Sequence, residues 1–390
     1  MAWPCESALS GWWIGLNLRI LIGASVISAA GSLPLQILPF LVLSLASEGR
    51  VDVAYAGWVG SAYLVGMLSS GLLLPLLRVS RLTRWQTVGA LAAIVVALSL
   101  SIDSSLFPVL LALWYVVGFA CGGLQFVGAT TAAAAPNKPQ AFALRLAVVL
   151  IVASAVIVAL ALFAGQKSYS TFVYFLVGAF GFAACIGLAL YRNIPALSPP
   201  ASGDASKPSD RQSWAGLVIV FAFFAGQPGF WAYAMQSASQ RGLDLKGAAF
   251  VIAASKIISA VALLYTSTSR SRGSGLPGLI GLGCSVAAGI LVMTYSSAVM
   301  IFFVGFLLWE LALNMLSARL QGIVVAGNPE HAGGWITGAI LLGAATGPIA
   351  HGAAIGGGVE LAFISYAAMS GLFPFLWAWS KNTPAKLIVT

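Results

Sequence analysis

A glutamate and a lysine in the middle of two long apolar stretches are the residues of this sequence best suited to chemistry. Glu310 lies within SAVMIFFVGFLLWELALNMLSAR, residues 297–319, and Lys256 lies within KGAAFVIAASKIISAVALLY, residues 246–265. A charge at the centre of a membrane helix costs roughly 2.5 to 3.5 kcal/mol, so such groups face a bundle interior and pair with one another. Asn314 follows Glu310 by four residues, which places both side chains on one helix face. We therefore expect Lys256 and Glu310 to be partners at similar depth.

Two roles are open for Glu310. Burial disfavours the charged form of a carboxyl group, so a buried glutamate can take up and release a proton and couple a proton gradient to movement. The alternative is a permanent ion pair with Lys256 that only holds two helices together. Lys256 is then the counter-ion of Glu310, an anchor for an anionic substrate, or a deprotonated lysine buried for packing. We predict that Glu310 is a proton site and that Lys256 is its partner.

A proline and a glycine stand inside another apolar stretch, AGQPGFWAYAMQ, at residues 225–236. Kinked helices expose backbone groups to a binding site near the middle of a membrane, so we expect a break at Pro228 and Gly229. Aromatic rings flanked by amides suit a solute with an apolar body and a polar tip. The side chains expected to contact it are Gln227, Trp231, Tyr233 and Gln236. The alternative places the two aromatic residues in the interfacial aromatic belt.

Polar side chains on other apolar stretches complete the expected substrate site. Arg145 stands in an apolar run, and no acidic residue lies inside any apolar run of the first half of the chain. It either extends to the membrane surface on its long stem or faces a cavity, as a site for an organic anion requires. Gln36 follows a proline kink, and Tyr115 and Asn314 add further polar groups. The alternative for these last three is hydrogen bonding between helices.

The composition of the chain is that of a membrane protein. It is 60% hydrophobic and 7% charged, with a mean hydropathy of +0.97, whereas soluble domains carry about 25% charged residues. The net charge of +9 comes from residues in short loops, which orient helices in a membrane, and it forms no patch for nucleic acid. The four cysteines are scattered, so neither a metal site nor a disulfide framework is expected. No cofactor and no enzyme motif is indicated.

Twelve apolar runs are long enough to cross a membrane, for which about 20 residues are needed. Residues 192–213 are rich in Pro, Ser and charge and predict a linker between a first domain, 1–191, and a second domain, 214–390. The first run is expected to stay in the mature chain, because no basic residue precedes Arg19. The runs are approximately 19–45, 54–77, 86–103, 107–131, 140–164, 171–191, 214–236, 246–266, 277–296, 297–320, 333–355 and 360–380.

Basic residues near the ends of these runs predict the orientation, because cytoplasmic loops carry an excess of Lys and Arg. With both termini cytoplasmic, that side receives eleven basic residues and the opposite side four, which favours this orientation. The eleven are Arg78, Arg81, Arg84, Lys138, Arg192, Lys207, Arg211, Arg270, Arg272, Lys381 and Lys386, and the four are Arg50, Lys167, Arg241 and Lys246. We expect an integral protein of the inner membrane of a bacterium.

Twelve helices in two sets of six, with a long central loop, resemble the major facilitator superfamily. Gly71 and the residues up to Pro75 lead into the basic residues of the next loop, as in the family's loop motif, although the aspartate of that motif is missing. Glycines of run 333–355, with Gly347-Pro348 among them, resemble the family's antiporter motif, here on helix 11 instead of helix 5. The resemblance implies an all-α membrane protein with two six-helix bundles around a central cavity, and alternating access without enzymatic activity.

The sequence and this resemblance predict a secondary transporter of a small organic solute, coupled to protons. Arg145 and Lys256 outnumber Glu310 in the membrane, which favours an organic anion as the solute. The expected partners are that solute, protons and the lipid bilayer, with the protein as a monomer. One alternative is an efflux transporter of hydrophobic or cationic compounds with Glu310 as the cation acceptor. Another is a membrane receptor or assembly partner that keeps the fold without transport.

Overall fold

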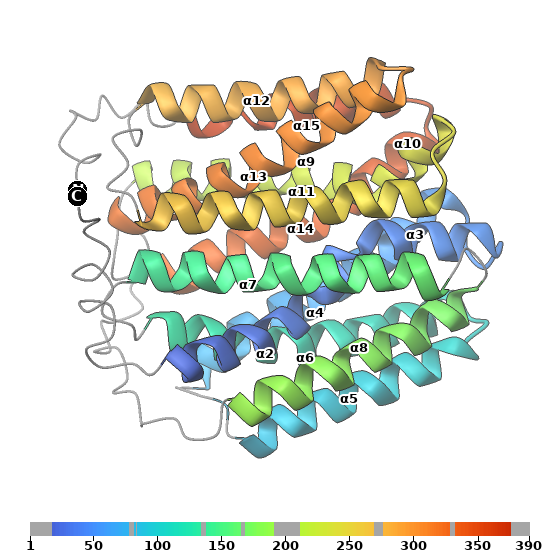
Figure 1. Ribbon diagram of the computed structural model, residues 1–390, viewed down its shortest axis with the longest axis vertical. Helices are drawn as coiled ribbons and strands as arrows, with labels where there is room; N and C mark the ends of the chain where they lie inside the picture. The colour runs from blue at the N-terminus through green and yellow to red at the C-terminus, as the bar shows by residue number, and fades with distance from the viewer. Residues whose placement is uncertain are drawn as a thin grey trace, which may run out of the picture.

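The computed structural model describes residues 18–77, 82, 84–133, 138–164, 168–190, 211–268, 276–327 and 332–375. These residues form helices that run side by side, with no strand among them (Figure 1). In this part of the chain, 11 helices are long and apolar enough to cross a membrane, and the shorter apolar helix Leu38–Ser47 extends the first of them. The chain is an integral membrane protein with an all-helical fold, as the sequence predicted.

The helices fall into two sets that we call the first half (α2–α8) and the second half (α9–α15). The helices long enough to span a membrane are apolar along most of their length, as expected where lipid replaces water and every backbone group must be satisfied within the helix. The first half consists of α2 (Leu18–Gln36), α3 (Leu38–Ser47), α4 (Val53–Leu76), α5 (Arg84–Ile102), α6 (Phe107–Ala133), α7 (Lys138–Ala159), a π-helical turn η1 (Leu160–Ala164) and α8 (Tyr169–Leu190). The second half consists of α9 (Arg211–Ala232), α10 (Ala234–Gln240), α11 (Leu245–Thr268), α12 (Leu276–Tyr295), α13 (Val299–Gly327), α14 (Ala332–Gly356) and α15 (Glu360–Ser370).

The halves meet along two long helix pairs. Helix α4 packs on α14, and α7 packs on α11, which lie next to each other in Figure 1. Helix α3 also contacts α9 and α10, and α3 and α10 lie at the same end of the bundle (Figure 1). We call this end, which also carries the turn between α14 and α15, the α10 end. Most of the expected linker, residues 192–210, lies outside the described residues, and its last three residues begin α9.

The first apolar run is divided at Ile37, where the backbone leaves the helical conformation (φ −112°, ψ 14°). Helix α2 continues through Pro34 to Gln36 and α3 begins at Leu38, so the kink expected at Pro34 lies instead at Ile37, just after Gln36. One backbone carbonyl at the kink has no helical donor, because Pro39 has no N–H to donate to the carbonyl four residues earlier. That carbonyl belongs to Leu35, and it is left without its helical partner.

The break expected at Pro228 and Gly229 is not there. Helix α9 continues through both residues to Ala232, and the backbone departs from helical geometry at Tyr233 (φ −107°, ψ 9°). Gly229 packs directly on the backbone of Gly347, where a Cβ atom on Gly229 would come within 2.7 Å of the Gly347 carbonyl oxygen. In the last expected run, α15 ends at Ser370, and residues 376–380 lie outside the described chain.

Candidate functional site

The ammonium group of Lys256 is the centre of a polar site shared by the two halves. Its nitrogen lies 2.9 Å from Oε1 of Glu310, and both side chains are almost fully buried, with 3% and 4% of their surface exposed. The same nitrogen donates a hydrogen bond to Oε1 of Gln36 at 2.8 Å and lies 4.6 Å from the centre of the Trp231 ring. A carboxylate, an amide oxygen and an aromatic face thus surround the charge, and each of them favours a cation.

The helices place these groups at one depth. Lys256 stands eleven residues after the start of α11, and Glu310 stands eleven residues after the start of α13. Gln36 stands eleven residues before the last residue of α3. Since a helix rises 1.5 Å per residue, all three lie about 16 Å from the α10 end, near the middle of a hydrocarbon layer about 30 Å thick.

Asn314 holds the carboxylate of Glu310 from the next turn of α13. Its Nδ2 donates to the main-chain oxygen of Glu310 at 2.8 Å and to Oε1 at 3.2 Å. The four-residue spacing seen in the sequence therefore produces a direct contact. The oxygen that receives the Lys256 hydrogen bond is the same one that Asn314 reaches, so both donors hold this oxygen in place.

Trp231 connects the two halves through the kink in the first half. Its Nε1–H donates to the carbonyl oxygen of Leu35 at 2.9 Å, the oxygen that Pro39 leaves without a helical donor. The indole stacks on Trp309 with ring centres 6.0 Å apart and planes 26° apart, and only 6% of Trp231 is exposed. Trp231 is therefore packed inside the protein and not part of an aromatic belt at the membrane surface.

Gln227 uses its amide within the second half. Its Nε2 donates to the carbonyl of Ala367 at 2.7 Å and to Oγ of Ser370 at 2.8 Å. Its Oε1 accepts the Nε1–H of Trp309 at 2.7 Å. The amide nitrogen of this α9 residue thus bonds to α15, and the amide oxygen bonds to α13. Gln227 therefore stabilises the packing of α9, the helix that carries Trp231. Its hydrogen bonds do not reach the ion pair.

Tyr233 lies at the α10 end, where the two halves approach each other closely. Its hydroxyl donates to the carbonyl of Val53 at 3.3 Å. A Cβ atom on Gly57 would come within 2.5 Å of this hydroxyl, and a Cβ atom on Gly352 would overlap the carbonyl oxygen of Ala54. Glycine is required at both positions because any side chain would force α4 and α14 apart. Tyr233 is 3% exposed and seals the α10 end.

Gln236 and Tyr115 are not joined to the ion pair by any contact in the described part of the chain. Oε1 of Gln236, on α10, is buried and receives no hydrogen bond from the described residues. Tyr115, on α6, is 37% exposed. Both were expected to contact a substrate, and the structure assigns neither of them a place beside Lys256.

Arg145 forms a second polar group in the first half. Its Nε donates to Oγ of Ser28 at 2.9 Å, and its Nη2 donates to Oε1 of Gln125 at 2.8 Å. The side chain is therefore held between α2, α6 and α7, where it is half-buried. Ser28 was missed by sequence reasoning, although the four-residue spacing of Ser28, Ser32 and Gln36 marks one polar face of α2.

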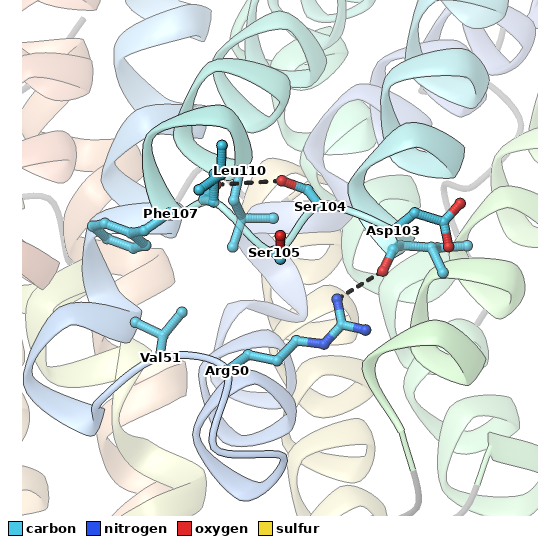
Figure 2. Close-up of a pocket in the computed structure, with 9 residues that line it drawn as sticks. Arg50, Val51, Asp103, Ser104, Ser105, Phe107 and Leu110 are labelled. Atoms are coloured by element: carbon cyan, nitrogen blue, oxygen red, sulfur yellow. Dashed lines mark hydrogen bonds between the residues drawn. The ribbon is translucent and has the colours of Figure 1, made fainter.

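An open pocket of about 310 Å³ lies at the α10 end of the first half, away from the ion pair. Arg50, Asp103 and Ser104 are among the residues that line it (Figure 2). Arg50 is already engaged, because it donates to the carbonyl of Ile102 at 2.8 Å and pairs with Glu48 at 2.9 Å. The pocket lies between two turns. Its arginine, Arg50, already bonds to Ile102 and Glu48.

Comparison with known proteins places this arrangement in a known fold. No family model matches the chain, and no curated protein matches it in sequence. The structure of the human organic anion transporter MFSD10 (TETRAN) is similar, with a TM-score of 0.62 and 14% identity over 92% of this chain and 97% of that chain. The nucleoside transporter NupG is similar with a TM-score of 0.68 and 13% identity, over 95% of this chain and 100% of that chain.

A third similar structure is FucP, a major facilitator superfamily transporter in the outward conformation. Its TM-score is 0.57 at 13% identity, over 94% of this chain and 99% of that chain. A second FucP structure, that of a point variant of the E. coli fucose:proton symporter, matches with the same TM-score and identity. The chain therefore has the fold of the major facilitator superfamily transporters, as the sequence predicted.

Proposed function

We propose that this protein is a proton-coupled secondary transporter of a small organic anion that works by alternating access. The observation that carries the proposal is the buried Lys256–Glu310 pair, which is also bonded to the first half through Gln36. Charge at this depth is expensive in a membrane and usually serves function. The similarity to an organic anion transporter and to a fucose:proton symporter supports the class of solute and the coupling.

The chemistry starts at the carboxylate of Glu310. When it takes up a proton it loses its negative charge, and the ammonium of Lys256 loses its counter-ion. The lysine then carries an uncompensated charge in a low-dielectric site, where an organic anion becomes its best partner. Proton and anion binding therefore support each other, which is the requirement for moving both in one cycle.

The position of the lysine links this chemistry to the movement of the halves. Lys256 and Glu310 belong to the second half, whereas Gln36 belongs to the first half. A change in the partners of Lys256 therefore alters a bond between the halves. The contact of Trp231 with Leu35 lies at about the depth of this bond, and the contact of Tyr233 with Val53 lies nearer the α10 end. We infer that these contacts separate when the α10 end opens and that the termini lie on the cytoplasmic side.

The test is solute-triggered proton movement in proteoliposomes that contain a pH-sensitive dye. Wild type is compared with Glu310→Gln, and Glu360→Gln serves as the matched control because it removes a carboxylate outside the candidate membrane spans. The solutes are organic anions, their neutral amides and lipophilic cations. The expected result is anion-driven proton uptake in wild type and in the control. In Glu310→Gln, we expect anion exchange without proton movement.

Each other outcome favours a different reading. Normal proton coupling in Glu310→Gln would show that the pair is structural. Proton movement driven by lipophilic cations and not by anions would favour the efflux transporter. Absence of flux for every solute in a folded, correctly inserted protein would favour a receptor or assembly partner with this fold.

A further inference from the structure

We propose that Arg145, together with Gln125 and Ser28, forms a second anion-binding station that receives the carboxylate of the solute. This inference rests on the proposed function for the class of solute, and it adds a site distinct from Lys256 and Glu310. Its starting point is a charge without a counter-ion. Among the described residues, Arg145 forms no ion pair, and its two side-chain partners are neutral oxygens.

The surrounding sequence offers no carboxylate at this depth. The candidate membrane spans of the first half, six in the described chain, contain no Asp or Glu. Glu48, Asp52 and Asp103 belong to turns at the α10 end, whereas Arg145 stands seven residues after the start of α7 at the opposite end. At 1.5 Å per residue this is about 10 Å into the bundle from that end. A half-buried charge at this depth, with no counter-ion among the described residues, favours an anion from outside the chain.

The guanidinium group has donors to spare for such an anion. It carries five N–H groups, and the hydrogen bonds to Ser28 and Gln125 engage Nε and Nη2, which leaves Nη1 without an acceptor among the described residues. Three N–H groups remain, two on Nη1 and one on Nη2, and they are available for the oxygens of a carboxylate. Ser28 and Gln125 hold the group in place, because they come from α2 and α6 and fix the arginine of α7 from two sides.

The station is connected to the Lys256 site along one helix face. Ser28 and Gln36 are eight residues apart on α2, or about 12 Å. Ser32 stands halfway between them on the same face and is 4% exposed. A small carboxylate cannot contact both cations at once across this distance. We infer that it occupies them in turn, with Lys256 as the station nearer the α10 end and Arg145 as the station nearer the opposite end.

The competing explanation is that Arg145 only clamps α2, α6 and α7 together through its two hydrogen bonds. The two explanations differ in what they predict for ligands. A clamp contributes stability whatever solute is present, whereas an anion station distinguishes a carboxylate from its uncharged amide. Binding therefore has to be measured as a difference between charged and neutral isosteres, with stability recorded separately.

The experiment measures the thermal unfolding of the purified full chain in detergent at constant ionic strength. Acetate, benzoate and succinate are compared with acetamide, benzamide and succinamide, because a ligand raises the unfolding temperature only of a protein that binds it. The variants are Arg145→Gln, which removes the charge, and Arg145→Lys, which keeps it. Arg84→Gln is the matched control, since Arg84 is exposed at the start of α5.

We expect at least one carboxylate to stabilise wild type and Arg84→Gln, and its amide to do so much less. Arg145→Gln should bind that carboxylate about tenfold or more weakly, because charge-assisted hydrogen bonds are among the strong ones. Arg145→Lys should retain the preference for carboxylate over amide. Equal carboxylate binding by wild type and Arg145→Gln, or no carboxylate effect in wild type, would overturn the station. Carboxylate binding does not depend on proton coupling. The thermal unfolding result can therefore be interpreted even if the Glu310 proposal fails in proteoliposomes.

Discussion

The indole nitrogen of Trp231, in the second half, donates to the carbonyl of Leu35, in the first half, across 2.9 Å. Replacing Trp231 by Phe keeps an aromatic ring against Lys256 and removes this bond. We expect the α10 end to separate more often, because one hydrogen bond contributes about 0.5–1.5 kcal/mol to its closed form. Spin labels at Ser47 on α3 and Gln240 on α10, both exposed, report the distance between the halves.

The matched control for this prediction is Trp85→Phe, because Trp85 is 82% exposed and lies on α5. Its label distances should equal those of wild type. Unchanged distances in Trp231→Phe as well would show that the Leu35 contact does not hold the halves together.

The Lys256–Glu310 pair predicts a strongly non-additive mutant cycle. Lys256→Met or Glu310→Gln alone should lower the free energy of unfolding by about 3–5 kcal/mol, because each leaves a buried partner unpaired. The double variant should lose much less than the sum of the two, since neither buried charge remains. Chemical unfolding in mixed micelles measures the cycle, with Lys246→Met as the control for loss of an exposed lysine. Additive losses would mean that the two groups do not interact.

Gly57 predicts a position-specific effect of one methyl group. A Cβ atom there would lie 2.5 Å from the hydroxyl of Tyr233 and 2.6 Å from the carbonyl oxygen of Pro348. The main-chain oxygen cannot turn away, so Gly57→Ala should destabilise the closed α10 end, and the thermal unfolding temperature should fall. Gly89→Ala, where the space is open, should be neutral or stabilising because alanine favours the helix by about 1 kcal/mol. Equal effects of the two substitutions would count against the tight contact.

The contact of Glu360 with His351 predicts a loss of folding stability in acid. Its carboxylate lies 3.7 Å from Nε2 of the buried His351, and its pKa is lowered by His351 and also by Arg241. Because the folded pKa is below the unfolded one, the contribution is present above the unfolded pKa, about 4.3, and disappears as pH falls through the folded pKa. Wild type should therefore lose more stability than Glu360→Gln between about pH 5 and about pH 3.

The measurement is the unfolding temperature as a function of pH for both proteins. Asp103→Asn removes an exposed carboxylate at the same end of the bundle and serves as the control. Parallel pH curves for wild type and Glu360→Gln would contradict the role of the histidine contact.

Residue type and position along the chain were enough to predict the helices, and together with the resemblance to the major facilitator superfamily they paired Lys256 with Glu310. Both charges stand in the middle of apolar runs, and the high cost of an isolated charge in lipid leaves few arrangements open. Helical spacing predicted that Asn314 and Glu310 share a face, and the structure adds a direct contact between them, whereas Asn314 had been expected to contact the solute. These features depend on one helix or on a strong energetic requirement, and such features can be read from sequence.

Contacts between helices of different halves could not be predicted in the same way. Gln36 was recognised as an amide beside a kink, but its bond to Lys256 joins residues 220 positions apart. Gln227 was expected to face a solute, whereas its amide is occupied by Trp309 and α15. An amide on an apolar helix has the same sequence pattern whether it faces a ligand or a neighbouring helix. Only the packing angle between helices decides, and the sequence does not display it.

The kink at Pro39 has a consequence for the solvent. While the α10 end is closed, the carbonyl of Leu35 is satisfied by the indole of Trp231. When the halves part, both groups lose their partner at once, and the carbonyl of Leu35 cannot form the usual helical bond instead because Pro39 has no N–H. Two bare polar groups are costly in hydrocarbon, so water must enter as they separate. Opening of the α10 end and entry of water then occur together. Solutes that lower water activity should therefore slow the opening.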